Sequence, residues 1–393
     1  MQADQVLRGH VVTPDRTVER GWIAMAEGRV LAVGEGESPT CSSRHEFGQA
    51  YLLPGLIDLH IHGMEEGDPG SEVGIRMMLR AAPKHGVTGI LPSLASSTRE
   101  GYLRFFENAR AAKESLGARL LGVHCEGPHI NPRMARGMDP RFLRPPNAEE
   151  DDALLAEGDG LLRIMTLSPE LPGSVNLIRK LRERGVVASL GHTAASREQV
   201  RAAVAAGASH VCHLFNAFPK PEREPDLPDT ASYCLEEPQL TLEVILDLVH
   251  VPQEKLQLAL EKAGVDRLVG VTDGMRGAGL GRGIYPMTDG RWYRIDADGG
   301  CRLVESEVLV GTAMTLTDGL RNLVRRMGLR LDEAVRICST NPARVLGLGN
   351  QLGKIAPGYR ADIVVFDENL IPLATFVEGR LVWQRDLPRN GGP

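Results

Sequence analysis

The middle of this chain alternates short strand-like runs with helix-like segments, and this alternation limits the possible fold more than any other feature. "VTGILPSL" precedes "REGYLRFFENARAAKES", "VVASLGH" precedes "REQVRAAVAAG", and "DRLVGVTDG" comes before "TLTDGLRNLVRRMG". Repeated units of this kind predict parallel strands joined by crossover helices. A central part of about 300 residues has the size of an eight-stranded α/β barrel, a TIM-like (β/α)8 fold. A doubly wound open sheet is the alternative, although no glycine-rich phosphate turn follows the first strand.

The two ends of the chain have a different sequence pattern from the middle, with strand-like runs and no helix-like segments between them. Residues 1–53 contain short β-like runs such as "GWIAMAEGRVLAVGEG", and residues 352–393 return to the same pattern. The alternation of apolar and polar residues, with turn residues between the runs, predicts hairpins. A chain of 393 residues also exceeds the usual size of one hydrophobic core. We therefore expect a small β domain formed by residues 1–53 and 352–393, and a barrel over residues 54–351.

Composition excludes several classes of protein. The net charge is −6 and no block of basic residues occurs, which argues against binding to nucleic acid or to an anionic membrane. The first residues, "MQADQVLRGH", lack the apolar core of a signal peptide, and no apolar run reaches the roughly 20 residues that span a bilayer. The six cysteines are scattered, as expected for small buried residues in a reducing compartment. We expect a cytoplasmic protein.

The stretch "PGLIDLHIHG" is apolar almost throughout, yet it ends with His60 and His62. Side chains on a strand alternate between its faces, so the two imidazoles point the same way and Leu59 and Ile61 point the other way. Two neighbouring imidazoles are either half of a metal site or a pair of core histidines. The second interpretation requires a separate hydrogen-bond partner for each ring.

Other predicted strands also end in polar residues, and these decide between the two interpretations. They are His124 and Glu126 in "LLGVHCEG", His192 in "VVASLGH", His213 in "HVCHLFNA" and Asp273 in "LVGVTDG". The carboxyl ends of barrel strands meet at one mouth, where the active sites of such barrels lie. Imidazoles and carboxylates together suit a divalent transition metal such as zinc, iron or manganese. The pattern therefore favours a metal site.

The order His-x-His, Glu, His, His, Asp resembles the metal-dependent amidohydrolase superfamily, and within it the family of N-acetylglucosamine-6-phosphate deacetylases. The resemblance extends over nearly the whole chain and rests on "PGLIDLHIHG", "HCEGPHINP", "LGHTAAS", "HLFNAF", "VTDG", "TLTDGLRNLV", "STNPARVLGL" and "LGKIAPGYRADIVV". It implies an α/β barrel flanked by a small β-sandwich built from both termini. It also implies that the protein is a homodimer and that its substrate is an N-acetylated amino sugar phosphate.

The resemblance implies a role for each predicted metal ligand. Glu126, His192 and His213 would bind one ion, and His60 and His62, with help from Asp273, would form a second site bridged by the glutamate. One or two divalent ions are therefore expected, with zinc first and iron or manganese as alternatives. His124 shares the face of Glu126, and we expect it to orient a ligand rather than to bind the metal.

Catalysis is expected to depend on Asp273 and His250. A metal ion lowers the pKa of bound water to roughly 7 and polarises an amide carbonyl. Asp273 would take the water proton and pass it to the departing nitrogen. His250, in "LDLVH", matches a family histidine that contacts the substrate and helps to hold the developing oxyanion. The structural alternatives are a helix cap for Asp273 and a surface histidine for His250.

Substrate recognition is where this sequence departs from the family. The predicted substrate-binding residues are Asn216, Ala217, Arg223, His250, Gly137, Met138 and Asp139. In the family an arginine after "HLFNA" reaches the phosphate, typically across a dimer interface. Arg223 matches it but lies in "EREPDLPD", where Glu222, Glu224 and Asp226 would compete for it. Asp139 stands where the family has a substrate-binding histidine.

Three functions follow from these residues. The first is deacetylation of N-acetylglucosamine 6-phosphate, which yields glucosamine 6-phosphate and acetate. The second is hydrolysis of another N-acyl compound, such as an acylated amino acid, another amino sugar or a cyclic amide. The third is a binding protein without catalysis, which the intact Glu126, His192, His213 and Asp273 argue against.

Overall fold

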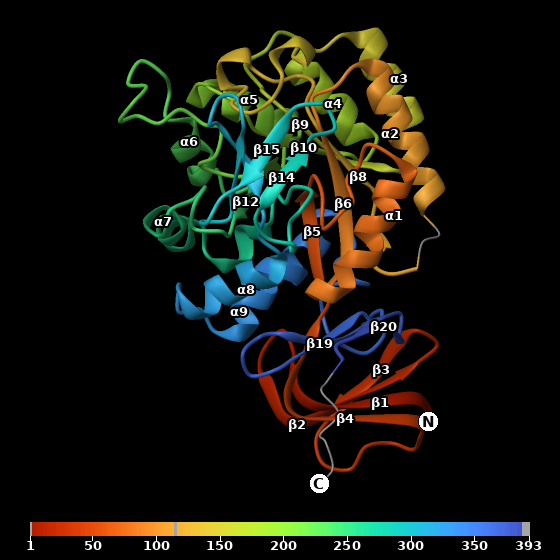
Figure 1. Ribbon diagram of the computed structural model, residues 1–393. Coiled ribbons are helices and arrows are strands. Elements are labelled where there is room, and N and C mark those ends of the chain that lie inside the picture. The colour runs from red at the N-terminus through yellow and green to blue at the C-terminus, as the bar shows by residue number, and fades with distance from the viewer. Residues whose placement is uncertain (1, 114–115, 387–393) are drawn as a thin grey trace.

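The computed structural model describes residues 2–113 and 116–386, and the strands in this part of the chain form three sheets. Figure 1 shows a barrel of strands surrounded by helices, with a smaller sheet, built from both ends of the chain, on one side of it. The third sheet lies in the upper part of the molecule, where β14 and β15 are labelled. The predicted fold class, an α/β barrel with a small β domain, is confirmed.

Eight parallel strands form the barrel and follow one another around it in chain order. They are β5 (Leu56–Ile61), β6 (Val87–Ala95), β8 (Val123–Glu126), β9 (Leu162–Leu167), β10 (Val187–Leu190), β11 (His210–Val211), β12 (Thr241–Ile245) and β13 (Leu268–Val271). A short strand, β7 (Arg119–Leu120), pairs with β6 outside this path. Sequential order excludes the doubly wound alternative, in which strand order reverses.

The barrel closes between its first and last strands. The amide of Asp273 donates to the carbonyl of His60 at 3.0 Å, and the amide of His62 donates to the carbonyl of Gly274 at 2.7 Å. A parallel bridge between Ile61 and Gly274 accompanies these bonds. We call this junction the seam. It lies at the carboxyl ends of both strands, so it belongs to the mouth of the barrel.

Helices cover the outside of the barrel between successive strands (Figure 1). They are α1 (Glu72–Ala81), α2 (Arg99–Ala112), α3 (Ala148–Glu157), α4 (Ser174–Glu183), α5 (Arg197–Ala206), α6 (Thr230–Glu236), α7 (Gln253–Ala263), α8 (Leu316–Arg325), α9 (Leu331–Val335) and α10 (Asn341–Val345). Side chains fix where several of them begin: Ser71 caps α1, Thr98 caps α2, and Thr315 with Asp318 forms a capping box at α8. Across the described residues, no helix combines the length and apolar character needed to cross a membrane.

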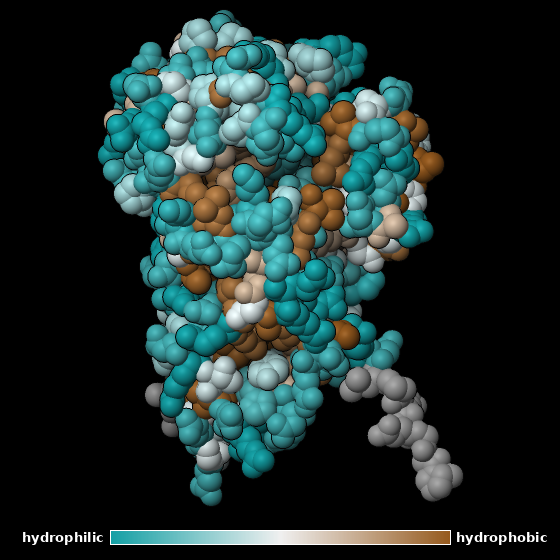
Figure 2. All heavy atoms as spheres, turned by 90° about the vertical axis from the view of Figure 1, so that its left-hand side faces the viewer, coloured by the Kyte–Doolittle hydropathy of each residue, from teal (hydrophilic) through white to brown (hydrophobic). Residues whose placement is uncertain are grey.

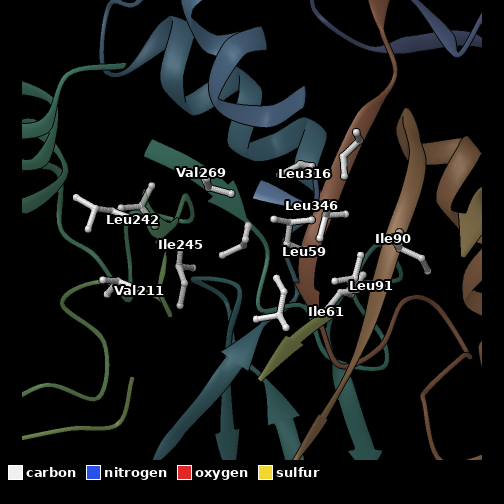
Figure 3. Close-up of a cluster of buried hydrophobic side chains, with 14 of the residues drawn as sticks. Leu59, Ile61, Ile90, Leu91, Val211, Leu242, Ile245, Val269, Leu316 and Leu346 are labelled. Carbon is white, nitrogen blue, oxygen red and sulfur yellow. The ribbon is translucent and has the colours of Figure 1, made fainter. Parts of the chain in front are cut away.

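Barrel strands are buried on both faces because side chains fill the inside and helices cover the outside. All six residues of β5 are buried, which accounts for the apolar run in "LIDLHI". Figure 3 shows Leu59 from the first strand and Val269 from the last within one apolar cluster that also includes Leu316 of α8. Full burial of a side chain of this size contributes about 1.5–3 kcal/mol relative to exposure, so the cluster holds the seam together.

The small β domain is one seven-stranded sheet in the order β20-β19-β18-β4-β1-β2-β3. Its strands are β1 (Ala3–Val12), β2 (Thr17–Ala26), β3 (Arg29–Gly34), β4 (Cys41–Pro54), β18 (Ile363–Phe366), β19 (Pro372–Val377) and β20 (Arg380–Gln384). The pairing of β4 with β18 joins the two ends of the chain, as the sequence predicted. An ion pair from Arg119 to Asp362, at 2.7 Å, connects the barrel to this domain.

A four-stranded antiparallel sheet separates β13 from α8, and the sequence did not predict it. Its strands are β14 (Gly283–Pro286), β15 (Trp292–Ile295), β16 (Gly300–Leu303) and β17 (Leu309–Thr312). Met275 donates to the carbonyl of Thr312, and Thr312 donates to the carbonyl of Asp273, both at 2.9 Å. These bonds attach the sheet to the mouth of the barrel beside the seam.

Candidate metal centre and active-site cavity

The predicted metal ligands all lie at the carboxyl ends of barrel strands. His60 belongs to β5 and Glu126 ends β8, whereas His192, His213 and Asp273 follow β10, β11 and β13. These last three residues have φ angles of 48°, 25° and 48°, in the left-handed region that residues other than glycine rarely adopt. Such conformations cost of order 1–3 kcal/mol each and persist where surrounding structure fixes them, commonly at functional sites.

Glu126 is the centre of the cluster, and its two oxygens face different imidazoles. Its Oε1 lies 2.8 Å from Nε2 of His213 and 3.0 Å from Nε2 of His192. Its Oε2 lies 3.3 Å from Nε2 of His62. That same nitrogen of His62 is 3.3 Å from Oδ1 of Asp273. One carboxylate thus stands between two groups of potential ligands.

Three overlapping sets of donor atoms among the described residues are close enough to hold a cation, and the third of them is formed by His60, His124 and Glu243. The atoms of the first set, from His60, Glu126, Cys212 and His213, lie within 4.8 Å of one another, as do those of the second, from His60, His62 and Asp273. His192 joins the first set through its contact with Glu126. The structure thus brings all six predicted ligands together, and it adds Cys212, a buried free cysteine that the sequence analysis did not single out.

Charges within the cluster fit a bound cation. Burial raises the pKa of the Glu126 carboxyl, but His60, His192 and His213 around it bring that pKa well below its usual value. Burial lowers the pKa of His62, but Asp273 and Glu126 more than reverse this and raise it to about 9. Without a cation the carboxylates are therefore balanced by protonated imidazoles. A divalent ion takes the place of those protons, because it binds neutral imidazole and ionised carboxylate.

A second carboxylate, Glu243 of β12, fixes the orientation of His60. Its Oε2 is 3.1 Å from Nδ1 of His60, and its Oε1 is 2.9 Å from Nε2 of His210. Glu243 is fully buried, so it has no water to exchange for these partners. Nδ1 of His60 donates a hydrogen bond to Glu243. The other ring nitrogen, Nε2, then faces Glu126 and His62. The sequence signal was present: one acidic residue interrupts the apolar run "LTLEVIL".

His124 lies behind the cluster, in a donor set with His60 and Glu243, and its ring nitrogens are engaged by other groups. Its Nε2 lies 2.8 Å from the hydroxyl of Thr166, and its Nδ1 lies 3.3 Å from the carbonyl of Leu59. Burial lowers the pKa of His124 to about 3, so the ring is neutral. Its ring packs edge-on against His60, with centroids 4.5 Å apart. These contacts agree with the expected orienting role.

A cavity of about 390 Å³ opens over the cluster. Its lining includes the metal-donor residues His62, Glu126, His192, His213 and Asp273, and the predicted substrate residues Gly137, Met138, Asp139, Asn216 and Ala217. Apolar side chains form much of the remaining wall, namely Leu94, Phe105, Phe142, Met275 and Val310. The surface is mostly hydrophilic in Figure 2, with apolar residues along the middle of the face shown. The cavity therefore combines charged groups at its floor with apolar walls, as small-molecule sites do.

Two predicted substrate residues, His250 and Arg223, are not among the described residues that line this cavity. His250 donates from Nδ1 to Asp247 at 2.6 Å, and its buried Nε2 has no partner in the described part of the chain. Arg223 is exposed on the loop between β11 and α6, which projects at the upper left of Figure 1. Of the three neighbouring acids, Glu224 is engaged elsewhere, at 3.0 Å from Arg136.

Replacing Glu126 with alanine should remove most of the metal that the purified protein contains. The substitution deletes the only carboxylate that contacts both His192 and His62 among the described residues. Elemental analysis after dialysis against trace zinc measures the effect, and thermal unfolding checks that the variant folds. Glu107→Ala, at an exposed position of α2, is the matched control. Metal content equal to that of the control would contradict the assignment.

Replacing Glu243 with glutamine should weaken metal binding without removing a ligand. The amide can donate to Nδ1 of His60 and so favour the tautomer whose proton is on Nε2, where the metal would bind. Loss of such a supporting partner typically costs about 10- to 100-fold in metal affinity. Titration against a chelator of known affinity measures the change, with Glu107→Gln as control. Unchanged affinity in a folded variant would show that Glu243 serves packing alone.

Comparisons with known proteins agree with this geometry. Residues 51–382 match the amidohydrolase family. The N-acetylglucosamine-6-phosphate deacetylase of Bacillus subtilis is 30% identical over 383 residues, which cover 95% of each chain. The N-acetylgalactosamine-6-phosphate deacetylase of Escherichia coli O157:H7 is 30% identical over 385 residues, covering 95% of this chain and 99% of that one.

A solved structure gives the same result at the level of the fold. It is a variant of N-acetyl-D-glucosamine-6-phosphate deacetylase from Mycobacterium smegmatis, in complex with N-acetyl-D-glucosamine-6-phosphate. It matches with a TM-score of 0.89 and 32% identity, over 97% of this chain and 99% of that chain. The resemblance noted in the sequence is therefore confirmed. The chain belongs to the amidohydrolase family and is a hydrolase.

Proposed function

We propose that this chain removes the acetyl group from N-acetylglucosamine 6-phosphate, giving glucosamine 6-phosphate and acetate. One observation carries the proposal: Glu126, His192, His213, His60, His62 and Asp273 converge at the floor of a cavity large enough for a small molecule. Similarity over nearly the full length to deacetylases of amino sugar phosphates supports it.

Zinc is the metal that the donor set favours, with iron or manganese as alternatives. A buried thiol and several imidazoles suit zinc better than harder ions, which prefer oxygen ligands. The division of contacts at Glu126, with His192 and His213 at one oxygen and His62 at the other, supports two neighbouring ions that share this carboxylate. Asp273 would complete the second position, beside His62.

Asp273 is the proposed general base and general acid. An ion held by the donor residues would acidify a water molecule and polarise the amide carbonyl. The Asp273 carboxylate accepts a proton from the attacking water and delivers it to the nitrogen as the carbon–nitrogen bond breaks. Its main-chain amide donates to the carbonyl of His60, so the seam fixes the backbone of Asp273, and the carboxylate lies 3.3 Å from Nε2 of His62.

The remaining predicted residues are assigned to substrate binding. Gly137, Met138 and Asp139 on one side of the cavity, and Asn216 and Ala217 on the other, would hold the sugar. Arg223 would reach the phosphate of the neighbouring subunit's substrate in a homodimer, as the family resemblance implies. The exposure of Arg223 on a projecting loop supports this arrangement. His250 would contact the substrate and help to hold the developing oxyanion. We place the protein in the cytoplasm.

A second candidate substrate is N-acetylgalactosamine 6-phosphate. The relative from Escherichia coli O157:H7 that is named for this compound has the same 30% identity as the Bacillus subtilis relative. The two sugars differ in the configuration of one hydroxyl, so the metal chemistry would be the same for both. The broader alternative is that the substrate is another N-acyl compound. Its hydrolysis would use the same metal donors and Asp273, and only the contacts with the cavity wall would differ.

Release of acetate from a set of compounds tests the function. The set contains N-acetylglucosamine 6-phosphate, its galactosamine epimer, unphosphorylated N-acetylglucosamine and an N-acetylated amino acid. We expect the highest kcat/KM for the first compound and a large loss without the phosphate. Preference for the epimer would select the second candidate. Equal rates with and without the phosphate would overturn the proposed substrate while leaving the hydrolase assignment intact.

Replacing Asp273 with asparagine should abolish most of the turnover and preserve the fold. Asparagine keeps the size of the side chain but cannot accept the water proton, and loss of general acid–base catalysis costs roughly 10²- to 10⁴-fold in rate. Steady-state kinetics measures kcat, and elemental analysis shows whether the main ion is retained. Asp159→Asn, at an exposed position after α3, is the matched control. A variant as active as this control would show that another group is the base.

A further inference from the structure

One arginine that lines the cavity forms no ion pair with the described residues. Four arginines line the cavity: Arg104, Arg136, Arg276 and Arg291. Three of them pair with a carboxylate: Arg136 with Glu224 at 3.0 Å, Arg276 with Asp68 at 3.2 Å, and Arg291 with Asp289 at 2.6 Å. Within residues 2–113 and 116–386, the guanidinium of Arg104 has no ion pair and no hydrogen bond.

Arg104 lies in the more exposed end of the cavity, which we call the outer arm. We define the outer arm by Asp68–Gly70, Arg104, Asn108, Arg276 and Thr288. Asn108, one turn after Arg104 on α2, donates to the carbonyl of Gly70 at 3.4 Å. Arg276 reaches the same segment through Asp68. The outer arm is solvent-accessible at Arg104 and Gly70, whereas the metal donors are almost all buried.

The unpaired donors of Arg104 favour binding of an anion from solution, more than those of the other cation in the outer arm. Arg276 pairs with Asp68 through Nη1, and Glu66 lies 3.6 Å from its Nη2. Both terminal nitrogens of Arg276 are therefore already close to a carboxylate. The guanidinium of Arg104, by contrast, has no carboxylate within ion-pair distance among the described residues, so its N–H donors are available to a ligand. A guanidinium presents paired donors that match the oxygens of a phosphate, and bonds of this kind are about twice as strong as neutral ones.

The position of the outer arm matches the shape of the proposed substrate. The acetamide must reach the buried donors at the floor, so the opposite end of the sugar extends toward the cavity opening. In N-acetylglucosamine 6-phosphate that end carries the phosphate. Arg223 does not line its own chain's cavity, so a subunit needs another cation if it is to bind the phosphate of the substrate whose acetamide it holds.

We propose that Arg104 binds the phosphate monoester of the substrate from the same chain that holds the acetamide. This inference rests on the proposed function and deepens it. Arg104 and the partner subunit's arginine, where the dimer forms, would contact the phosphate from two sides. A dianion accommodates two guanidinium groups without competition for the same oxygens.

Kinetics of Arg104→Met and Arg104→Lys test the proposal, using N-acetylglucosamine with and without the 6-phosphate. Arg110→Met, on the same helix but outside the cavity lining, is the matched control. For Arg104→Met we expect KM for the 6-phosphate to rise roughly ten- to a hundredfold, the loss of one charge-assisted hydrogen bond. We expect kcat at saturation, and all rates with the unphosphorylated sugar, to stay at the control's values. Lysine should restore part of the affinity.

Inhibition by inorganic phosphate shows whether a negative result disproves the role of Arg104 or the proposed function. The inhibition constant of inorganic phosphate is measured for wild type and for each variant. If wild type prefers the 6-phosphate but Arg104→Met keeps the control's KM and inhibition constant, Arg104 is not the phosphate ligand, and the function stands. An equal loss on both sugars would also overturn the proposal, because it indicates a structural role.

In the remaining outcome, the wild-type protein has the same kcat/KM for the sugar with and without the 6-phosphate. The proposed substrate would then no longer include a phosphate. In that case a higher inhibition constant in Arg104→Met than in Arg110→Met still supports an anion site in the outer arm. Identical inhibition constants would overturn it.

Discussion

Two main-chain hydrogen bonds, from Asp273 to His60 and from His62 to Gly274, join the first strand of the barrel to the last. Three of the residues that make these bonds, His60, His62 and Asp273, also carry donors of the candidate metal centre. Closing the barrel and assembling the site are therefore one event. Because the strands that meet at the seam lie at opposite ends of the barrel sequence, the site forms only after the most distant contacts of the domain have formed.

Burying so many titratable groups at the seam is unfavourable unless each finds a partner. The structure provides these partners in layers: Glu126 lies close to four imidazoles, Glu243 contacts His60 from behind, and Thr166 contacts His124. The innermost layer is left with carboxylates that only protons or a cation can balance. This imbalance, more than any single ligand, is what makes the cluster a candidate metal centre.

The sequence predicted the barrel and the convergence of its polar strand ends, because strands have a period of two and barrel strands point their carboxyl ends the same way. It could not predict that Cys212 and Glu243 approach His60, since those contacts depend on the register between strands distant in sequence. Arg104 was missed because any face of α2 could have met the cavity. The sheet β14–β17 was missed because its short strands carry charged residues, among them Arg294 and Arg302, that resemble loop sequence.

The sheet β14–β17 supplies cavity wall from Pro286, Arg291 and Val310 without contributing a strand to the barrel. Substitutions in these strands can reshape that wall while every hydrogen bond of the barrel ladder stays in place. The molecule thus separates two kinds of position: residues at the strand ends carry the donor groups of the site, whereas residues of the inserted sheet shape the wall that decides what fits. The shape of the cavity can therefore be altered within one segment of about 30 residues, a length too short to need a core of its own.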